Sequence, residues 1–175
     1  MSDSLFAPPT IDARVFRDTL GHYASGITVV SGIADGEPVG FTCQSFYSVS
    51  VDPPLVSFSV MLNSTTYPRI RETGKFSVNV LAHEQHGISN QFARKGTDKW
   101  AGIQWLPTRN DNPVILDTLM WLDCDLYAEY EAGDHYIVIG QVNEMSSTDW
   151  HTGEPLLYFK GQYRTLRELE AAGEI

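Results

Sequence analysis

The segment LDCDLYAEY at residues 122–130 decides the fold class, because its apolar and polar side chains alternate along its whole length. One face would carry Leu122, Cys124, Leu126 and Ala128, and the other Asp123, Asp125, Tyr127 and Glu129. A period of two is typical of an antiparallel strand with one face buried and the other in solvent. The turn residues Ala-Gly-Asp at 132–134 and the apolar segment 135–144 then predict that the chain returns as a hairpin.

Outward from this hairpin, five other segments rich in β-branched and apolar residues predict strands at 27–31, 38–46, 55–60, 76–81 and 156–159. Helices are expected at 12–23, between the capping residues 63–66 and Gly74, and at 84–95. The buried side of the first helix would consist of Val15, Phe16, Leu20 and Tyr23. The charged tail from Arg167 is expected to add a short helix. Six or seven strands with few helices predict a mainly β protein, an antiparallel barrel with helices packed outside it.

Composition narrows the class of protein. The chain has 175 residues, which suits one domain over 1–175 with a core at about 12–166, and 42% of them are hydrophobic. No apolar run approaches the roughly 20 residues that span a bilayer, and the N-terminus lacks the features of a secretory signal. The net charge of -10 disfavours nucleic acid and anionic membranes as partners. Two cysteines, Cys43 and Cys124, predict reduced thiols in a cytoplasmic protein.

Residues 40–54, GFTCQSFYSVSVDPP, place small hydroxyl and amide side chains in a predicted strand. A core strand would leave such groups buried at a cost unless partners satisfied them, so we expect this stretch to line a groove for a polar, planar ligand. Other polar groups that suit a phosphate lie at residues 48–50, 63–66, 92–95 and at His135. Taken singly, each fits a capping or turn role equally well. Only the whole set indicates a flat, anionic ligand.

Several common sites are missing from the sequence. No Gly-x-Gly-x-x-Gly follows a strand, and neither a Walker phosphate loop nor a Gly-x-Ser-x-Gly elbow is present. His83 and His86 have a spacing that could hold a metal ion, but without an obvious third ligand a solvated helix face is the favoured interpretation. Cys43 has no sequence neighbour that would activate it as a nucleophile, so we favour a small side chain near the ligand.

Five segments in order carry a family resemblance: FRDTLGHYASGITVVS (16–31), PVGFTCQSFYSVSVDPPLVSFSV (38–60), FSVNVL (76–81), GDHYIVIGQV (133–142) and PLLYFKGQYRTL (155–166). Over about residues 12–166 the chain resembles the flavin reductase family, the small NADH-dependent partners of two-component flavin monooxygenases. It looks closest to the reductases that serve aromatic and steroid-ring hydroxylases. The resemblance implies a homodimeric Greek-key split β-barrel of the FMN-binding type with peripheral helices. One flavin, FMN or FAD, would lie in a groove at the dimer interface.

The resemblance also implies roles for particular residues. The flavin ring and ribityl chain would be lined by Thr42, Cys43, Gln44 and Ser45, with Ser48 and Ser50 nearby. The phosphate would be held by Asn63, Ser64, Thr65 and Thr66, with Arg94 or Lys95 within reach. Phe92 and Ala93 would close over the flavin, and His135 of the Gly-Asp-His motif would contact the nicotinamide. Many relatives have threonine in place of Ser25, and alanine or serine with asparagine in place of Cys43-Gln44. The choice between FMN and FAD therefore stays open.

Hydride transfer needs stacked rings more than acid–base help, so His135 is expected to position the nicotinamide rather than to donate a proton. The expected protein partner is an oxygenase that receives the reduced flavin, which requires a modest, roughly micromolar flavin affinity. NADH is preferred over NADPH because the acidic surface gives no reason to expect a basic pocket for an extra phosphate. Two alternatives remain: an oxidase with tightly held FMN, and a flavin-binding module without turnover.

Overall fold

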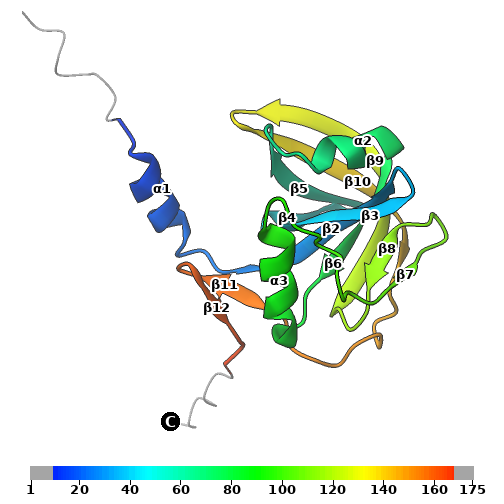
Figure 1. Ribbon diagram of the computed structural model, residues 1–175. Coiled ribbons are helices and arrows are strands. Elements are labelled where there is room, and N and C mark those ends of the chain that lie inside the picture. The colour runs from blue at the N-terminus through cyan, green and yellow to red at the C-terminus, as the bar shows by residue number, and fades with distance from the viewer. Residues whose placement is uncertain (1–9, 168–175) are drawn as a thin grey trace, which may run out of the picture.

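A seven-stranded antiparallel sheet forms the body of the protein in a computed structural model that describes residues 10–167 (Figure 1). The strand order is β3-β2-β6-β9-β10-β5-β4. The bounds are β2 Thr28–Ala34, β3 Glu37–Cys43, β4 Phe46–Ser50, β5 Leu55–Met61, β6 Lys75–Val80, β9 Met120–Ala132 and β10 His135–Met145. The two edge strands, β3 and β4, are separated in the chain by only Gln44 and Ser45, so one sharp corner joins the two edges of the split barrel. The predicted mainly β, antiparallel fold is confirmed.

The hairpin predicted from residues 122–144 forms the longest strand pairing in the sheet. β9 and β10 pair from Leu122↔Met145 to Ala132↔His135, and Gly133 takes a positive φ of 63° in the turn between them. Two residues depart from the expected alternation. Glu129, assigned to the solvent face, lies partly buried beyond a register shift at Ile139/Gly140, where its carboxylate accepts hydrogen bonds from Tyr67 and Arg71 of the helix that follows residue 66. Asp123, assigned to the solvent face, is fully buried. Its carboxylate accepts hydrogen bonds from Thr108 Oγ1 at 2.8 Å, Asn112 Nδ2 at 2.7 Å and Asn110 Nδ2 at 2.6 Å.

The donors to Asp123 lie on a hairpin in a region expected to be a loop. Its strands are β7 Trp105–Pro107 and β8 Pro113–Ile115. Because this hairpin covers the outer face of the sheet at Asp123, that face is not solvated there, and three neutral donors take the place of water. A second small sheet is formed by β1 Ser25–Gly26, β11 Leu157–Phe159 and β12 Gln162–Arg164.

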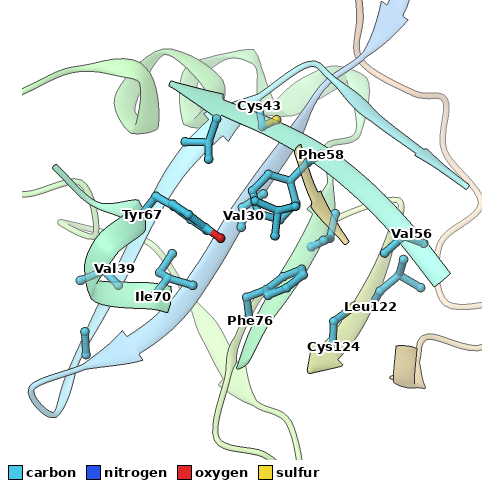
Figure 2. Close-up of a cluster of buried hydrophobic side chains, with 14 residues drawn as sticks. Val30, Val39, Cys43, Val56, Phe58, Tyr67, Ile70, Phe76, Leu122 and Cys124 are labelled. Carbon is cyan, nitrogen blue, oxygen red and sulfur yellow. The ribbon is translucent and has the colours of Figure 1, made fainter. Parts of the chain in front are cut away.

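The main core fills the barrel interior (Figure 2). Phe58 of β5 lies at its centre, with its ring centroid 5.2 Å from that of Phe76 and 6.0 Å from that of Tyr67, both in edge-to-face geometry. Tyr67 and Ile70 belong to α2, Tyr67–Thr73, the short helix that packs onto one end of the barrel. As predicted, this helix accepts Pro68 in its first turn and ends at Gly74, which adopts a left-handed φ of 71°.

The helix expected at 84–95 is two shorter elements, a 3₁₀ turn η1 at His83–Gln85 and the helix α3 at His86–Ala93. α3 packs beside β3 on the outside of the barrel. Within residues 10–167 no helix is both long and apolar enough to cross a membrane. The helix expected after Arg167 falls on residues 168–175, outside the described part of the chain.

The first helix, α1 at Ala13–Leu20, differs most from its prediction. Asp12 caps it through hydrogen bonds from the Arg14 and Val15 backbone amides, both 2.9 Å. Its apolar side chains were expected to be buried, but none of the helix residues is buried. The exposed side chains include Val15 at 62%, Phe16 at 50%, Leu20 at 55% and Tyr23 at 84%. In Figure 1 the helix stands away from the barrel, so nothing in the described part of the same chain covers this face.

Candidate functional site

A groove of about 570 Å³ opens beside the corner between β3 and β4, between the loop before α2 and the end of α3. Most of the predicted site residues line it, although they come from four separate parts of the chain. Those residues are Thr42, Cys43, Gln44, Ser45, Asn63, Ser64, Thr65, Thr66, Phe92, Ala93 and His135. The volume lies within the range of ordinary small-molecule sites, roughly 300–1,000 Å³.

The floor of the groove, Thr42 to Ser45, uses its polar groups to hold the protein together. Thr42 Oγ1 donates to the carbonyl of Ser89 in α3 at 2.6 Å. Ser45 Oγ donates to the Ser59 carbonyl and accepts from the Ser59 amide, both at 3.1 Å. These bonds join the strand corner to α3 on one side and to β5 on the other. The floor is polar because side chains supply the connections that a continuous sheet would make through its backbone.

Cys43 lies between these two hydrogen-bonding residues. Its Sγ approaches the Ser59 carbonyl at 3.6 Å and the Ser45 hydroxyl at 3.5 Å. Burial raises the pKa of the Cys43 thiol. The thiol is therefore neutral near pH 7 and unsuited to nucleophilic attack, which agrees with the interpretation of Cys43 as a small groove side chain.

Gly40 sets the distance between α3 and the barrel. A Cβ at this position would lie 3.0 Å from Cε1 of Phe92 and 3.1 Å from the carbonyl oxygen of Val30. Phe92 is fully buried against β3, and its ring also meets Trp100 edge-to-face with centroids 4.9 Å apart. A glycine inside a strand permits this close approach. Through it, the end of α3 brings Ala93 to the groove.

One end of the groove carries the donors that suit a phosphate. Asn63 and Thr65 are exposed, and Ser64 Oγ accepts from the Tyr67 amide at 3.1 Å, so the predicted capping role belongs to Ser64. Lys95 and Lys99 line the same cavity. The ammonium of Lys99 donates to the Gly40 carbonyl at 3.1 Å, while burial, and then the charge of Lys95, lower the pKa of Lys99. Hydroxyls, an amide and two ammonium groups fit a phosphate ester.

The groove also contains His135, the first residue of β10, which lies opposite Met61 of β5. His135 Nδ1 is 2.6 Å from Asp134 Oδ1. This hydrogen bond, with the histidine charge, lowers the pKa of the exposed Asp134 carboxyl. With Nδ1 engaged by Asp134, Nε2 is the ring nitrogen left for a ligand. Phe41, Val60 and Met61 add apolar walls that fit a planar ring.

Three predicted residues lie outside the groove. Ser48 and Ser50 belong to the edge strand β4, and Arg94 follows α3 with an exposed side chain, so none of them lines the cavity.

Sequence reasoning missed the apolar walls and Ser59, because nothing in their own strands distinguishes them from ordinary core residues. Lys99 also had no signal of its own in the sequence. His83 pairs with Glu84 at 3.2 Å, and no three candidate metal ligands converge in the part of the chain that the structure describes.

The chain is similar to known proteins over most of its length. Residues 20–167 match the family model of the flavin reductase like domain. The chain belongs to the flavin reductase family. It is 42% identical over 154 residues to a flavin reductase from Pseudomonas putida, covering 87% of this chain and 89% of that one. It is 40% identical over 153 residues to the flavin-dependent monooxygenase reductase subunit HsaB of Mycobacterium tuberculosis (strain H37Rv), covering 87% of this chain and 82% of that one.

Solved structures agree. The nitrilotriacetate monooxygenase component B homologue from Mycobacterium thermoresistibile superposes with a TM-score of 0.86 at 35% identity, covering 92% of each chain. The names of two further relatives state which flavin and which nicotinamide nucleotide they use. One is an FMN reductase (NADH), SmoA of Agrobacterium fabrum, 35% identical over 93% of this chain and 91% of its own. The other is the NADH:FAD oxidoreductase SgcE6 of Streptomyces globisporus, solved with NAD and FAD fragments, with a TM-score of 0.81 and 29% identity over 95% and 100%.

Proposed function

We propose that this chain is a single-domain NADH-dependent flavin reductase that supplies reduced flavin to a partner monooxygenase. The observation that carries the proposal is one continuous groove with phosphate-binding chemistry at Asn63–Thr66 and Lys95, apolar walls, and His135. The relative HsaB, the reductase subunit of a flavin-dependent monooxygenase, supports the oxygenase as the recipient of the reduced flavin. Both cysteines are free and buried, which suits a reducing compartment, and we infer a cytoplasmic protein.

The position of each groove residue indicates which part of the flavin it would contact. Asn63, Thr65 and Thr66 would bind the flavin phosphate, with Ser64 shared between this role and capping α2. The floor residues Thr42, Cys43, Gln44 and Ser45 would lie under the ring and ribityl chain, and Phe92 and Ala93 would bound the groove at the end of α3. Ser48, Ser50 and Arg94 receive no ligand role within one subunit. The site has no arginine among its lining residues and few charges, which suits a flavin that exchanges with solvent.

The chemistry requires positioning more than proton transfer. A bound flavin and nicotinamide would supply the hydride chemistry, which requires two rings stacked at roughly 3–3.5 Å. His135 would orient the nicotinamide through Nε2, while Asp134 holds the imidazole through Nδ1 at 2.6 Å. The apolar walls, Phe41, Val60 and Met61, would exclude water from the stacked rings. Neutral groups of the floor would set the orientation of the flavin without contributing an acid or base.

A homodimer is part of the proposal. Its support is the apolar face of α1, where Val15, Phe16 and Leu20 are each at least half exposed in one chain. An exposed stripe of this kind on a helix marks an interaction surface. A second copy would cover it. Light scattering after size exclusion tests this: the unmodified protein should run as a dimer, and Leu20→Asp should shift it toward monomer. A monomer at micromolar concentration for the unmodified chain would contradict the dimer.

The activity is tested by following NADH oxidation with FMN, FAD or riboflavin added in excess. A reductase should be largely colourless after dialysis and should turn over as soon as free flavin is supplied. A firmly bound yellow chromophore that requires a separate substrate would instead indicate an oxidase. Flavin binding without NADH oxidation would indicate a non-catalytic module. Either result would overturn the proposed function.

A further inference from the structure

A second cavity adjoins the phosphate end of the groove. Its volume is about 240 Å³, and four of its lining residues, Thr65, Thr66, Lys95 and Lys99, also line the groove. His135 does not line it, whereas Arg69 of α2 and Trp100 line it and do not line the groove. The volume is below the roughly 300 Å³ of a complete small-molecule site. The second cavity therefore fits part of a ligand whose other part lies in the groove.

The charge around this cavity is unusual for the chain. The whole sequence has a net charge of -10, yet Arg69, Lys95 and Lys99 line the second cavity together, against one lining carboxylate, Asp98. Asp98 is also engaged, because its Oδ1 accepts from the Trp100 amide at 3.0 Å. An acidic chain is not expected to form a basic pocket, yet these three cations line one cavity. Partial burial, and then the charge of Lys95, lower the pKa of Lys99, and an anion placed between the two lysines would favour the charged form of Lys99.

Arg69 is held in place with donors to spare. One Nη donates to Asp35 at 3.2 Å and to the Ala34 carbonyl at 3.4 Å. A guanidinium carries five N–H donors in a fixed fork, so the remaining donors can meet a phosphate. Trp100 adds an aromatic surface to the cavity wall. Cations beside an aromatic ring suit a phosphate attached to a flat base.

We propose that the second cavity binds the adenosine monophosphate half of FAD, which makes FAD the preferred flavin of this chain. The inference rests on the proposed function, since it extends the flavin from the groove. FMN ends at the phosphate held near Thr65 and Thr66, and FAD continues from that phosphate into a second phosphate, a ribose and an adenine. The shared lining residues place the second cavity at this junction. Arg69 lines the second cavity and not the groove, so it discriminates between the two flavins.

Adenosine phosphates also occur in NADH and NADPH, so the experiment separates these sources. Equilibrium binding of oxidised FMN and FAD is measured by quenching of flavin fluorescence, for the unmodified protein and for Arg69→Gln. The expected result is a Kd for FAD about tenfold lower than that for FMN, and a rise of about tenfold in the FAD Kd of the variant, the size of one charge-assisted hydrogen bond. The FMN Kd should change less than twofold. AMP should compete with FAD and leave FMN binding unchanged.

Arg109→Gln is the matched control, because Arg109 is also a surface arginine paired with a carboxylate, Glu144 at 3.6 Å, and lies away from both cavities. It should leave both Kd values unchanged. Equal weakening of FMN and FAD by Arg69→Gln, or no weakening of either, would overturn the inference. A change confined to the KM of NADH or NADPH would assign the cavity to the nicotinamide nucleotide and would also overturn it. If the unmodified protein bound neither flavin, the proposed function would fail first and this inference with it.

Discussion

The floor and the rim of the groove are both rich in hydroxyl groups, but they use them differently. On the floor, Thr42 and Ser45 donate to backbone carbonyls and tie the strand corner to α3 and β5. On the rim, the loop before α2 and the start of β10 present Thr65, Thr66 and His135 to the cavity. A polar residue that lines a site can therefore serve to hold the site together rather than to bind the ligand. Floor substitutions should reduce stability, and rim substitutions should reduce binding.

The largest effect is expected at Gly40, where the floor meets α3. Gly40→Val should lower the free energy of unfolding by about 3 kcal/mol, because even a Cβ would lie 3.0 Å from the buried Phe92 ring and 3.1 Å from the Val30 carbonyl. Urea denaturation measures the change. The matched control is Gly87→Ala in α3, where an added Cβ meets nothing within 4 Å. Similar losses for both variants would contradict the close-packing role of Gly40.

A pair of isosteric substitutions then separates floor from rim. Thr42→Val removes the hydroxyl that donates to Ser89 at 2.6 Å and should cost about 1–2 kcal/mol of stability. Thr66→Val should change stability by less than about 0.5 kcal/mol, because within residues 10–167 its hydroxyl has no protein partner. Thr66→Val should instead raise the flavin Kd about fivefold, the size of one neutral hydrogen bond. The distinction collapses if Thr66→Val is the less stable of the two.

The sequence could predict those parts of the fold that depend on local pattern, but not those that depend on contacts with distant segments. The strands of the central sheet followed from local alternation and β-branched composition. The β9–β10 hairpin is confirmed, but its pairing shifts register at Ile139/Gly140 and Val142/Glu144, which the alternation did not predict. Asp123 could not be placed correctly, because its burial depends on a hairpin over residues 105–115 that folds across the sheet. The α1 face was placed wrongly for a related reason. Amphipathic periodicity reports that a face will be covered, but not that the cover comes from within one chain.

The residues that line the groove could be predicted from the sequence better than the contacts that those residues make. Hydroxyl-rich loops and the Gly-Asp-His turn indicated most of the groove lining. Lys99 was not singled out, because its place depends on the chain after α3 passing back over Gly40. Neither could the sequence distinguish Ser45, which is engaged by the Ser59 backbone, from Thr66, which faces the cavity. Hydrogen-bond partners fourteen or more residues away leave no local trace.

A third prediction concerns the rim at the nicotinamide position. His135→Ala should raise the KM for NADH about tenfold, which corresponds to the loss of one well-placed hydrogen bond of roughly 1.4 kcal/mol. The flavin Kd should change less than twofold, because Asn63–Thr66 lie on a different element. Steady-state kinetics with NADH varied at saturating flavin, together with flavin titration, give both numbers. Equal effects on NADH and flavin would show that His135 does not belong to the nicotinamide position.

The smallest effect is expected at Asp134, which acts on the rim only through His135. Asp134→Asn keeps the size of the side chain and weakens the 2.6 Å contact with His135 Nδ1, so the KM for NADH should rise about threefold, less than for His135→Ala. The hydrogen bond lowers the pKa of the Asp134 carboxyl. A carboxyl with a lowered pKa stabilises the fold above its ordinary pKa, and this stabilisation is lost as the pH falls through the lowered value.

The pH dependence therefore separates a positioning role from a general loss of structure. The difference in Tm between the unmodified protein and Asp134→Asn should be present at pH 7 and should disappear at acid pH, once the carboxyl is protonated in the folded protein. Glu131→Gln, an exposed carboxylate on the same hairpin, is the matched control and should leave KM unchanged. If Asp134→Asn raised KM as much as His135→Ala, Asp134 would contact the nicotinamide nucleotide itself. The division of the rim into a contacting histidine and a positioning aspartate would then be wrong.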